Sequence, residues 1–168
     1  MTAAADAAEF RRTVGLFASG VTVVATQVDG ILHGMTANAF CSVSLDPLLV
    51  LVCVDREAGL HGLLERSGQF AITVLAAGQE DVSRWFASSR RPAGQDQFDD
   101  QRWRPAPHTG APVLTDGLAY LDCRLHQAHQ AGDHTVCIGE VLAVGPLGGT
   151  EPLLWYRGRY THLAQPPP

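Results

Sequence analysis

The chain contains no lysine: all 12 of its basic residues are arginines, against 17 acidic residues, and the formal net charge is −5. Scattered arginines in an acidic chain form no basic stripe for a phosphate backbone, so nucleic-acid binding is not expected. A P-loop needs Gly-Lys-Ser/Thr and is therefore excluded, and no Gly-x-Gly-x-x-Gly follows any expected strand. The P-loop and dinucleotide-fold interpretations are both rejected.

Long apolar runs and paired cysteines are lacking as well. The most apolar run, residues 48–54, is too short to cross a bilayer and is typical of a buried strand. The N-terminal residues lack the basic-then-apolar order of a secretory signal. The four cysteines are widely spaced with no Cys-x-x-Cys pair, so we expect no disulfide framework and no metal site. We therefore expect no membrane partner and a reducing, cytoplasmic compartment.

The chain does have enough apolar material for a self-sufficient core. It has 168 residues, of which 46% are hydrophobic and 17% charged, as is typical of one globular domain. We expect a single domain over residues 1–168, with residues 1–8 and 165–168 as flexible tails.

Many short strands with turn signals dominate the pattern. Asp29-Gly30 predicts a hairpin between strands at 21–28 and 31–40, and further strands are expected at 41–45, 48–54, 70–75, 118–129, 135–144 and 153–163. In the 41–45 strand, Val43 and Leu45 are expected to point inward. Short helices are expected at 5–17, 58–66 and 79–86, and residues 88–112 have no clear periodicity. Because strands and helices do not alternate, the sequence predicts a mainly β protein with an antiparallel barrel.

Residues 34–40, Gly-Met-Thr-Ala-Asn-Ala-Phe, are unusual for a strand, since glycine and asparagine are depleted there. Backbone groups exposed beside small side chains can hydrogen-bond the edge of a flat heteroaromatic ring. The alternative is an irregular edge strand with a bulge.

Residues 53–61 join the buried strand to a helix. Backbone amides at a helix start bind phosphate well, and Arg56 would add a charged contact. The alternative is an ordinary turn, with Asp55 as the helix cap and a solvated pair of Arg56 and Glu57.

Two further segments carry groups that suit a cofactor. Gly132-Asp133-His134 delivers a histidine to a strand start, where it could bind a carboxamide or steer a proton. Residues 156–160, Tyr-Arg-Gly-Arg-Tyr, could form a stacking or anion-binding corner. A structural histidine and a solvated terminal strand are the alternatives. Five other histidines share no metal-ligand spacing and are interpreted as structural: His33, His108, His126, His129 and His162.

Taken together and in order, these segments resemble the flavin reductase family, the NAD(P)H:flavin oxidoreductases that act as reductase components of two-component flavin-dependent monooxygenases. The likeness covers nearly the whole chain, and its motifs lie at residues 10–17, 19–24, 35–40, 42–47, 70–75, 118–123, 132–134, 139–141 and 156–160.

The resemblance implies an FMN-binding split β-barrel with a Greek-key-like antiparallel sheet, usually a homodimer with flavin sites near the subunit interface. It implies an isoalloxazine edge lined by Thr36, Ala37, Asn38 and Ala39. It implies a ribityl and phosphate cradle of Cys53, Val54, Asp55, Arg56, Gly59 and Leu60. Ala87 and Arg91 would close over the flavin, and His134, as the catalytic residue, would meet the nicotinamide with Tyr156, Arg159 and Tyr160. Relatives tend to carry hydroxyls where this chain has Ala58, Gly59 and Leu60, which leaves more of the phosphate to backbone amides and Arg56.

The activity implied is hydride transfer from NADH or NADPH to FMN or FAD, after which the reduced flavin leaves by diffusion to a separate monooxygenase. Such transfer needs orientation rather than an acid–base triad. A flavin-binding electron carrier or redox sensor without NAD(P)H turnover is the alternative. An oxidase of the pyridoxamine-phosphate type and a structural domain are more distant ones.

Overall fold

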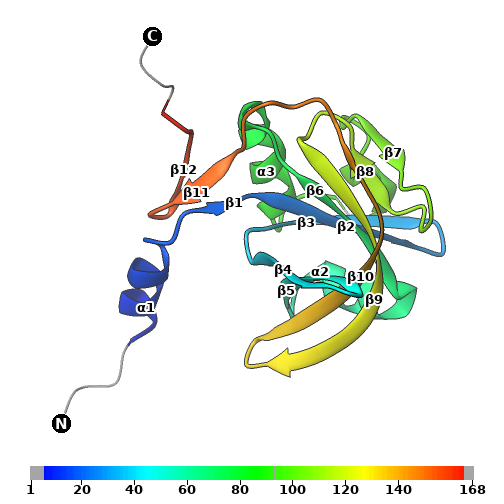
Figure 1. Ribbon diagram of the computed structural model, residues 1–168, viewed down its shortest axis with the longest axis horizontal. Helices are drawn as coiled ribbons and strands as arrows, with labels where there is room; N and C mark the ends of the chain where they lie inside the picture. Colours follow the sequence, from blue (N-terminus) through cyan, green and yellow to red (C-terminus); the bar gives the residue numbers. More distant parts are fainter. Residues whose placement is uncertain (1–5, 93, 165–168) are drawn as a thin grey trace.

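The computed structural model describes residues 6–92 and 94–164, and its centre is one curved antiparallel sheet (Figure 1). The strand order in this seven-stranded sheet is β3-β2-β6-β9-β10-β5-β4. Residues 1–5 and 165–168, which make up most of the expected tails, lie outside the described residues. The mainly β, antiparallel prediction is confirmed. The strands are β2 (Thr22–Val28), β3 (Ile31–Ala37), β4 (Phe40–Leu45), β5 (Leu48–Asp55), β6 (Gln69–Val74), β9 (Ala119–Ala131) and β10 (His134–Pro146).

Two small sheets and three helices complete the described part. The small sheets are formed by β1 (Ser19–Gly20), β11 (Leu154–Tyr156) and β12 (Arg159–Thr161), and by β7 (Trp103–Pro105) and β8 (Pro112–Leu114). The helices are α1 (Ala7–Val14), α2 (Gly59–Ser67) and α3 (Glu80–Ala87), with 3-10 turns η1 (Ala77–Gln79) and η2 (Gly94–Gln97). None of the helices in residues 6–92 and 94–164 is long and apolar enough to cross a membrane.

The core lies on both faces of β2, whose residues 22–26 are all buried. Val24 belongs to a cluster that includes Leu60 and Leu64 of α2. The alternate residue Val23 belongs to a second cluster, which includes Phe86 of α3. Because successive side chains of a strand point to opposite faces, a strand covered on both sides buries successive residues, and the two buried threonines Thr22 and Thr26 donate their hydroxyls to carbonyls. The helices thus close the two faces of the sheet.

Two hairpins turn through residues with positive φ. Asp29 (φ 51°) and Gly30 (φ 77°) join β2 to β3, as the Asp-Gly pair predicts. Arg157 (φ 51°) and Gly158 (φ 73°) make the corresponding turn between β11 and β12. The expectation of one strand over residues 153–163 is therefore wrong, because Arg157 adopts the left-handed conformation that the pattern assigned to extended backbone.

The expectation that Val43 and Leu45 point inward is also wrong. β4 is an outermost strand of the sheet, and these side chains are 46% and 88% exposed. A register shift between Ser42 and Ser44 interrupts the alternation on which the expectation depended. Nearby, α1 stands apart from the barrel (Figure 1), buries none of its residues, and leaves Phe10 and the following Phe17 exposed.

Candidate functional site

A cavity of about 590 Å³ opens between β3, the turn from β5 into α2, and the segment that follows α3. This volume is within the range of sites that bind small molecules. Its lining is His33, Met35, Thr36, Asp55, Glu57, Ala58, Gly59, Phe86, Ala87, Ser88, Ser89, Arg91 and Pro92. We call this space the large cavity, since it is the larger of two adjoining spaces.

A second cavity of about 210 Å³ adjoins it, lined by Val21, Thr36, Asn38, Ala87, Trp155 and Tyr160. Thr36 and Ala87 line both spaces, so the small cavity continues the large one across β3 and the end of α3. The rings of Trp155 and Tyr160 lie edge to face with centroids 4.9 Å apart. One site thus has a polar compartment and an aromatic-walled compartment.

The wall between β3, α3 and β12 is held by a chain of polar contacts. The Thr36 hydroxyl donates to the Ser83 carbonyl at 2.7 Å, and the Ser83 and Tyr160 hydroxyls are 2.8 Å apart. The Arg84 guanidinium lies 4.7 Å from the centroid of the Tyr160 ring. These contacts hold the Tyr160 ring against α3, beside β3.

Arg91 fastens the segment after α3 onto β3. Its Nη2 donates to the Gly34 carbonyl at 2.6 Å, its Nη1 donates to the Ser88 carbonyl, and its Nε donates to Gln97 Oε1 at 3.2 Å. Burial lowers the pKa of Arg91. Within residues 6–92 and 94–164, no carboxylate forms an ion pair with this guanidinium.

His33 borders the large cavity although sequence reasoning interpreted it as structural. Its Nδ1 lies 2.9 Å from Gln97 Nε2, and its Nε2 lies 3.3 Å from Arg91 Nη2. Burial, and secondly the charge of Arg91, lowers the pKa of His33 to about 4. Strand alternation could have found it, because His33 lies two residues before Met35 and shares its face of β3.

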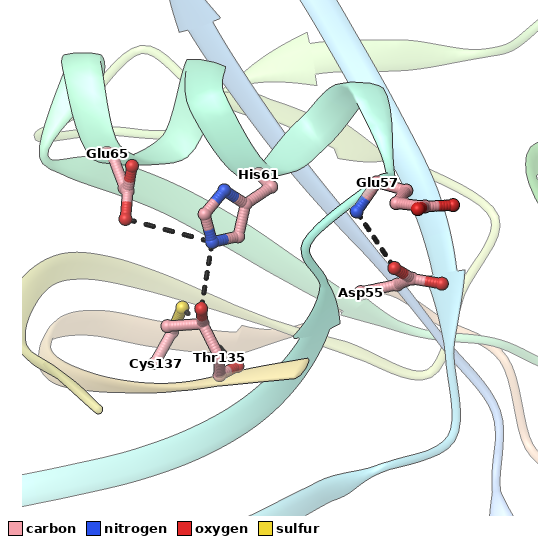
Figure 2. A network of polar contacts seen from close by, with 6 residues as sticks. All are labelled: Asp55, Glu57, His61, Glu65, Thr135 and Cys137. Atoms are coloured by element: carbon pink, nitrogen blue, oxygen red, sulfur yellow. Dashed lines mark hydrogen bonds and ion pairs between the residues drawn. The ribbon is translucent and has the colours of Figure 1, made fainter. Parts of the chain in front are cut away.

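The turn between β5 and α2 forms another wall. Asp55 Oδ1 accepts the Glu57 amide at 2.9 Å, so Asp55 stabilises the turn, while Ala58 occupies the helix cap without a side-chain bond. Figure 2 shows His61 reaching from α2 to β10, where its Nε2 lies 2.8 Å from Thr135 Oγ1. This contact ties the start of α2 to the sheet.

The structure brings together many of the residues expected in the flavin site. Thr36, Asp55, Gly59, Ala87 and Arg91 line the large cavity, and Thr36, Asn38, Ala87 and Tyr160 line the small one.

Arg56 is placed differently. It lines a third cavity of about 740 Å³ together with Asp55, Glu57, His61 and Asp133. Asp55 and Glu57 border both this space and the large cavity. Among the described residues that line the large cavity, Arg91 is the arginine.

Several other expected residues have structural contacts. Val54 and Leu60 are fully buried in the core beneath the turn. The carbonyl of the buried Ala37 accepts the Thr22 hydroxyl at 2.7 Å, and the Cys53 amide donates to the Ala39 carbonyl at 3.1 Å.

His134 begins β10 opposite Asp55 of β5 and lies outside the linings of the large and small cavities. Its Nδ1 is 2.8 Å from Asp133 Oδ1, and this hydrogen bond lowers the pKa of Asp133. In the terminal hairpin, the Arg157 guanidinium lies 5.2 Å from the centroid of the Tyr156 ring, and Arg159 is exposed.

An open antiparallel barrel with adjoining polar and aromatic compartments is a suitable frame for an enzyme that aligns two flat nucleotide substrates. Comparison with known proteins identifies the class of enzyme. Residues 14–164 match the flavin reductase like domain. An NADH-dependent FAD reductase from Streptomyces globisporus is 43% identical over 159 residues, covering 95% of this chain and 87% of that protein. The reductase subunit of a flavin-dependent monooxygenase from Rhodococcus jostii is 39% identical, covering 95% of this chain and 80% of that protein.

Solved structures of similar proteins support the same class. The flavin reductase component of a bacterial two-component tryptophan halogenase superposes with a TM-score of 0.89 at 40% identity, covering 96% of this chain and 100% of that one. The Streptomyces globisporus NADH:FAD oxidoreductase, in complex with NAD and FAD fragments, gives a TM-score of 0.88 at 40% identity and covers 95% of this chain and 94% of that one.

The chain belongs to the flavin reductase family. It has the split-barrel fold of that family, and it is an NAD(P)H:flavin oxidoreductase that supplies reduced flavin to a monooxygenase component. The predicted family, fold and activity are confirmed.

Proposed function

We propose that the flavin ring occupies the small cavity along residues 36–39 and that its ribityl phosphate chain extends into the large cavity. The observation that carries this placement is that the two cavities meet at Thr36 and Ala87. The small cavity offers Trp155 and Tyr160 as walls for a flat ring, and the large one offers Arg91 and backbone groups for a charged chain.

The flavin accepts a hydride from the nicotinamide, and the chain supplies binding and orientation. Thr36, Asn38, Trp155 and Tyr160 would hold the flavin ring in the small cavity and orient it for the nicotinamide, which is what hydride transfer requires of the protein. We propose that His134, with Tyr156 and Arg159, contacts that nicotinamide. The exposed imidazole of His134 is supported by Asp133, which fits a contact to a carboxamide.

We propose NADH as the preferred donor and both FAD and FMN as acceptors, since the Streptomyces globisporus relative is an NADH-dependent FAD reductase and a relative from Agrobacterium fabrum is an FMN reductase (NADH). Steady-state oxidation of NADH and NADPH with each flavin tests this assignment. We expect turnover with NADH and either flavin, and failure of all four combinations would contradict the activity. Flavin absorbance that is not bleached by either nicotinamide under nitrogen would instead support an electron carrier.

The His134→Ala variant tests the nicotinamide contact. We expect a higher KM for NADH or a lower kcat, with the flavin Kd unchanged. Kinetics equal to those of the unmodified enzyme would remove His134 from the site.

We propose a homodimer, in which a second copy covers the apolar surface beside β4. Phe17 is 81% exposed and Leu45 is 88% exposed, and Val14 and Phe17 line a cavity with Asn38 and Ala39 of the flavin edge. Apolar side chains so exposed are typical of an interface. Sedimentation equilibrium should give twice the chain mass, and Phe17→Ser should shift it toward the monomer. A monomer at all concentrations would refute the proposal.

A further inference from the structure

The Gln97 side chain has only one orientation that satisfies its neighbours. Its Oε1 faces the Gly34 amide at 3.2 Å and Arg91 Nε at 3.2 Å, both of which are donors. The oxygen is therefore placed correctly, and the amide nitrogen is the atom that faces His33 Nδ1 at 2.9 Å. Gln97 is 1% exposed, so an unmatched amide here would be costly.

This orientation determines the tautomer of His33. The Gln97 amide nitrogen donates, so His33 Nδ1 must accept and carry no proton. A neutral imidazole then has its proton on Nε2. The ring is neutral at physiological pH because burial and the Arg91 charge hold its pKa at about 4. Asp55 and Glu57, the carboxylates that line the same cavity, do not reverse this shift.

Two donors consequently lie side by side in the wall of the large cavity. The Nε2–H of His33 and the Nη2 of Arg91 are 3.3 Å apart and cannot bond to each other. Arg91 uses neutral acceptors on Gly34, Ser88 and Gln97 and has no carboxylate partner in residues 6–92 and 94–164. A neutral N–H beside an unneutralised guanidinium suits one shared anionic oxygen.

The space for that oxygen is kept open by Gly59. A Cβ at this position would lie 3.0 Å from His33 Cε1 and 3.2 Å from its Nε2. The absence of a side chain on Gly59 lets the imidazole face the cavity beside the start of α2.

We propose that His33 donates its Nε2–H to a phosphoryl oxygen of the flavin nucleotide beside Arg91, and that Gln97 is the positioning residue that fixes the imidazole tautomer. The inference rests on the proposed flavin site and assigns its phosphate contact to His33 and Arg91 in place of Arg56.

Riboflavin, which lacks the phosphate, is the probe that isolates this contact. In His33→Asn the amide oxygen takes the place of Nδ1 and accepts from Gln97, and no donor remains at the Nε2 position, whereas His33→Gln keeps a donor there. We measure the Kd of FMN and of riboflavin by quenching of flavin fluorescence, without nicotinamide. We expect His33→Asn to weaken FMN on the order of tenfold, His33→Gln to restore most of the affinity, and riboflavin to change less than about twofold.

Arg91→Ala should also weaken FMN more than riboflavin, and its exposed neighbour gives the matched control Arg90→Ala, which should change neither. Equal loss of both flavins in His33→Asn, or no loss of FMN, would overturn the proposal. Reduction of riboflavin by NADH reports separately on the activity, because riboflavin has no phosphate. If the unmodified enzyme did not reduce riboflavin, that result would contradict the function and not the phosphate contact.

Gln97→Glu tests the positioning role. Its carboxylate still accepts from Gly34 and Arg91 but now accepts from His33 Nδ1 as well, which moves the imidazole proton away from Nε2 and raises the His33 pKa. The Kd of FAD, whose pyrophosphate does not titrate near neutrality, should be flat from about pH 6 to about pH 8 in the unmodified enzyme and rise with pH in the variant. A flat profile in Gln97→Glu would refute the role of Gln97.

Discussion

Replacing Gly59 by alanine should weaken flavin binding, although alanine is the better helix former. Gly59 is the first residue of α2, and its φ is ordinary, so alanine introduces no backbone strain. The added Cβ would, however, lie 3.0 Å from His33 Cε1. His33 cannot retreat freely because Gln97 holds its Nδ1 at 2.9 Å.

The two effects on stability oppose each other. Alanine in place of glycine gains about 0.5–1 kcal/mol from the backbone, whereas overpacking against a held ring costs about 1–3 kcal/mol. We therefore expect Gly59→Ala to lower the free energy of unfolding by about 1 kcal/mol and by no more than about 2.5 kcal/mol. For a chain of this size that corresponds to a fall in Tm of about 2–4 °C and at most about 10 °C.

Gly62, one turn later in α2, provides the matched control. A Cβ there meets nothing within 4 Å, and the residue is exposed. Gly62→Ala should therefore keep only the backbone gain, raising Tm by about 1–4 °C, and should leave the flavin Kd unchanged.

Thermal unfolding and FMN titration of the two variants give the decisive comparison. We expect Gly59→Ala to be the less stable of the two and to bind FMN several-fold more weakly. If Gly59→Ala were stabilised as much as Gly62→Ala and bound FMN normally, the contact between His33 and α2 would have no energetic role and the reasoning would be refuted.

Three further outcomes are expected. Because the folded pKa of His33 lies near 4, below its ordinary 6.5, the unfolded chain takes up the proton first, so acidification between these values destabilises the fold. Between about pH 7.5 and about pH 5, urea titrations should show His33→Gln losing about 1 kcal/mol less stability than the unmodified protein, after discounting for partial exposure. An identical loss in both proteins would contradict this. Asp122 is fully buried and accepts hydrogen bonds from the amides of His108 and Thr109 and from the Thr109 hydroxyl. Asp122→Ala should therefore lower the free energy of unfolding by about 3–5 kcal/mol, measured by calorimetry. A decrease below about 1 kcal/mol would contradict a structural role for these bonds. Burial raises the pKa of Cys123 to about 12 and of Cys137 to about 11, so a thiol reagent should label them only after unfolding, and labelling in the native protein would disprove their inertness.

Patterns of neighbouring residues in the sequence predicted the turns and strands whose conformation depends on those residues alone. Asp29-Gly30 predicted the β2–β3 hairpin because those two residues readily adopt positive φ. The apolar run at 48–54 predicted β5, in which Val50, Val52 and Val54 are buried and the alternate side chains are half-buried. In contrast, Val43 and Leu45 have the alternation of a half-buried strand but lie on an edge strand of the sheet, where both side chains are exposed.

The site was predictable only in part, because its walls meet through contacts between distant segments. Thr36, Asn38 and Gly59 lie in motifs with unusual composition, and the motif order pointed to them. Arg91 bonds to Gly34 across 57 positions and Gln97 meets His33 across 64, distances over which no periodicity carries information. Arg56 was favoured by adjacency to the helix start, yet it borders a different cavity.

The way in which Arg91 is held explains how a lysine-free chain of net charge −5 can present a local cation. Arg66, Arg84, Arg102 and Arg124 each form a surface ion pair with a carboxylate, which neutralises their charge. Arg91 is instead oriented by uncharged carbonyl and amide oxygens, which fix its direction and leave its charge to act on the cavity, where partial burial weakens solvent screening. A protonated His33 beside it would add like-charge repulsion, and a neutral one adds a donor without that cost. The low pKa of His33 and the absence of a carboxylate paired with Arg91 in the described chain are therefore parts of one arrangement, which places an unpaired guanidinium and a neutral donor side by side in the wall of the large cavity.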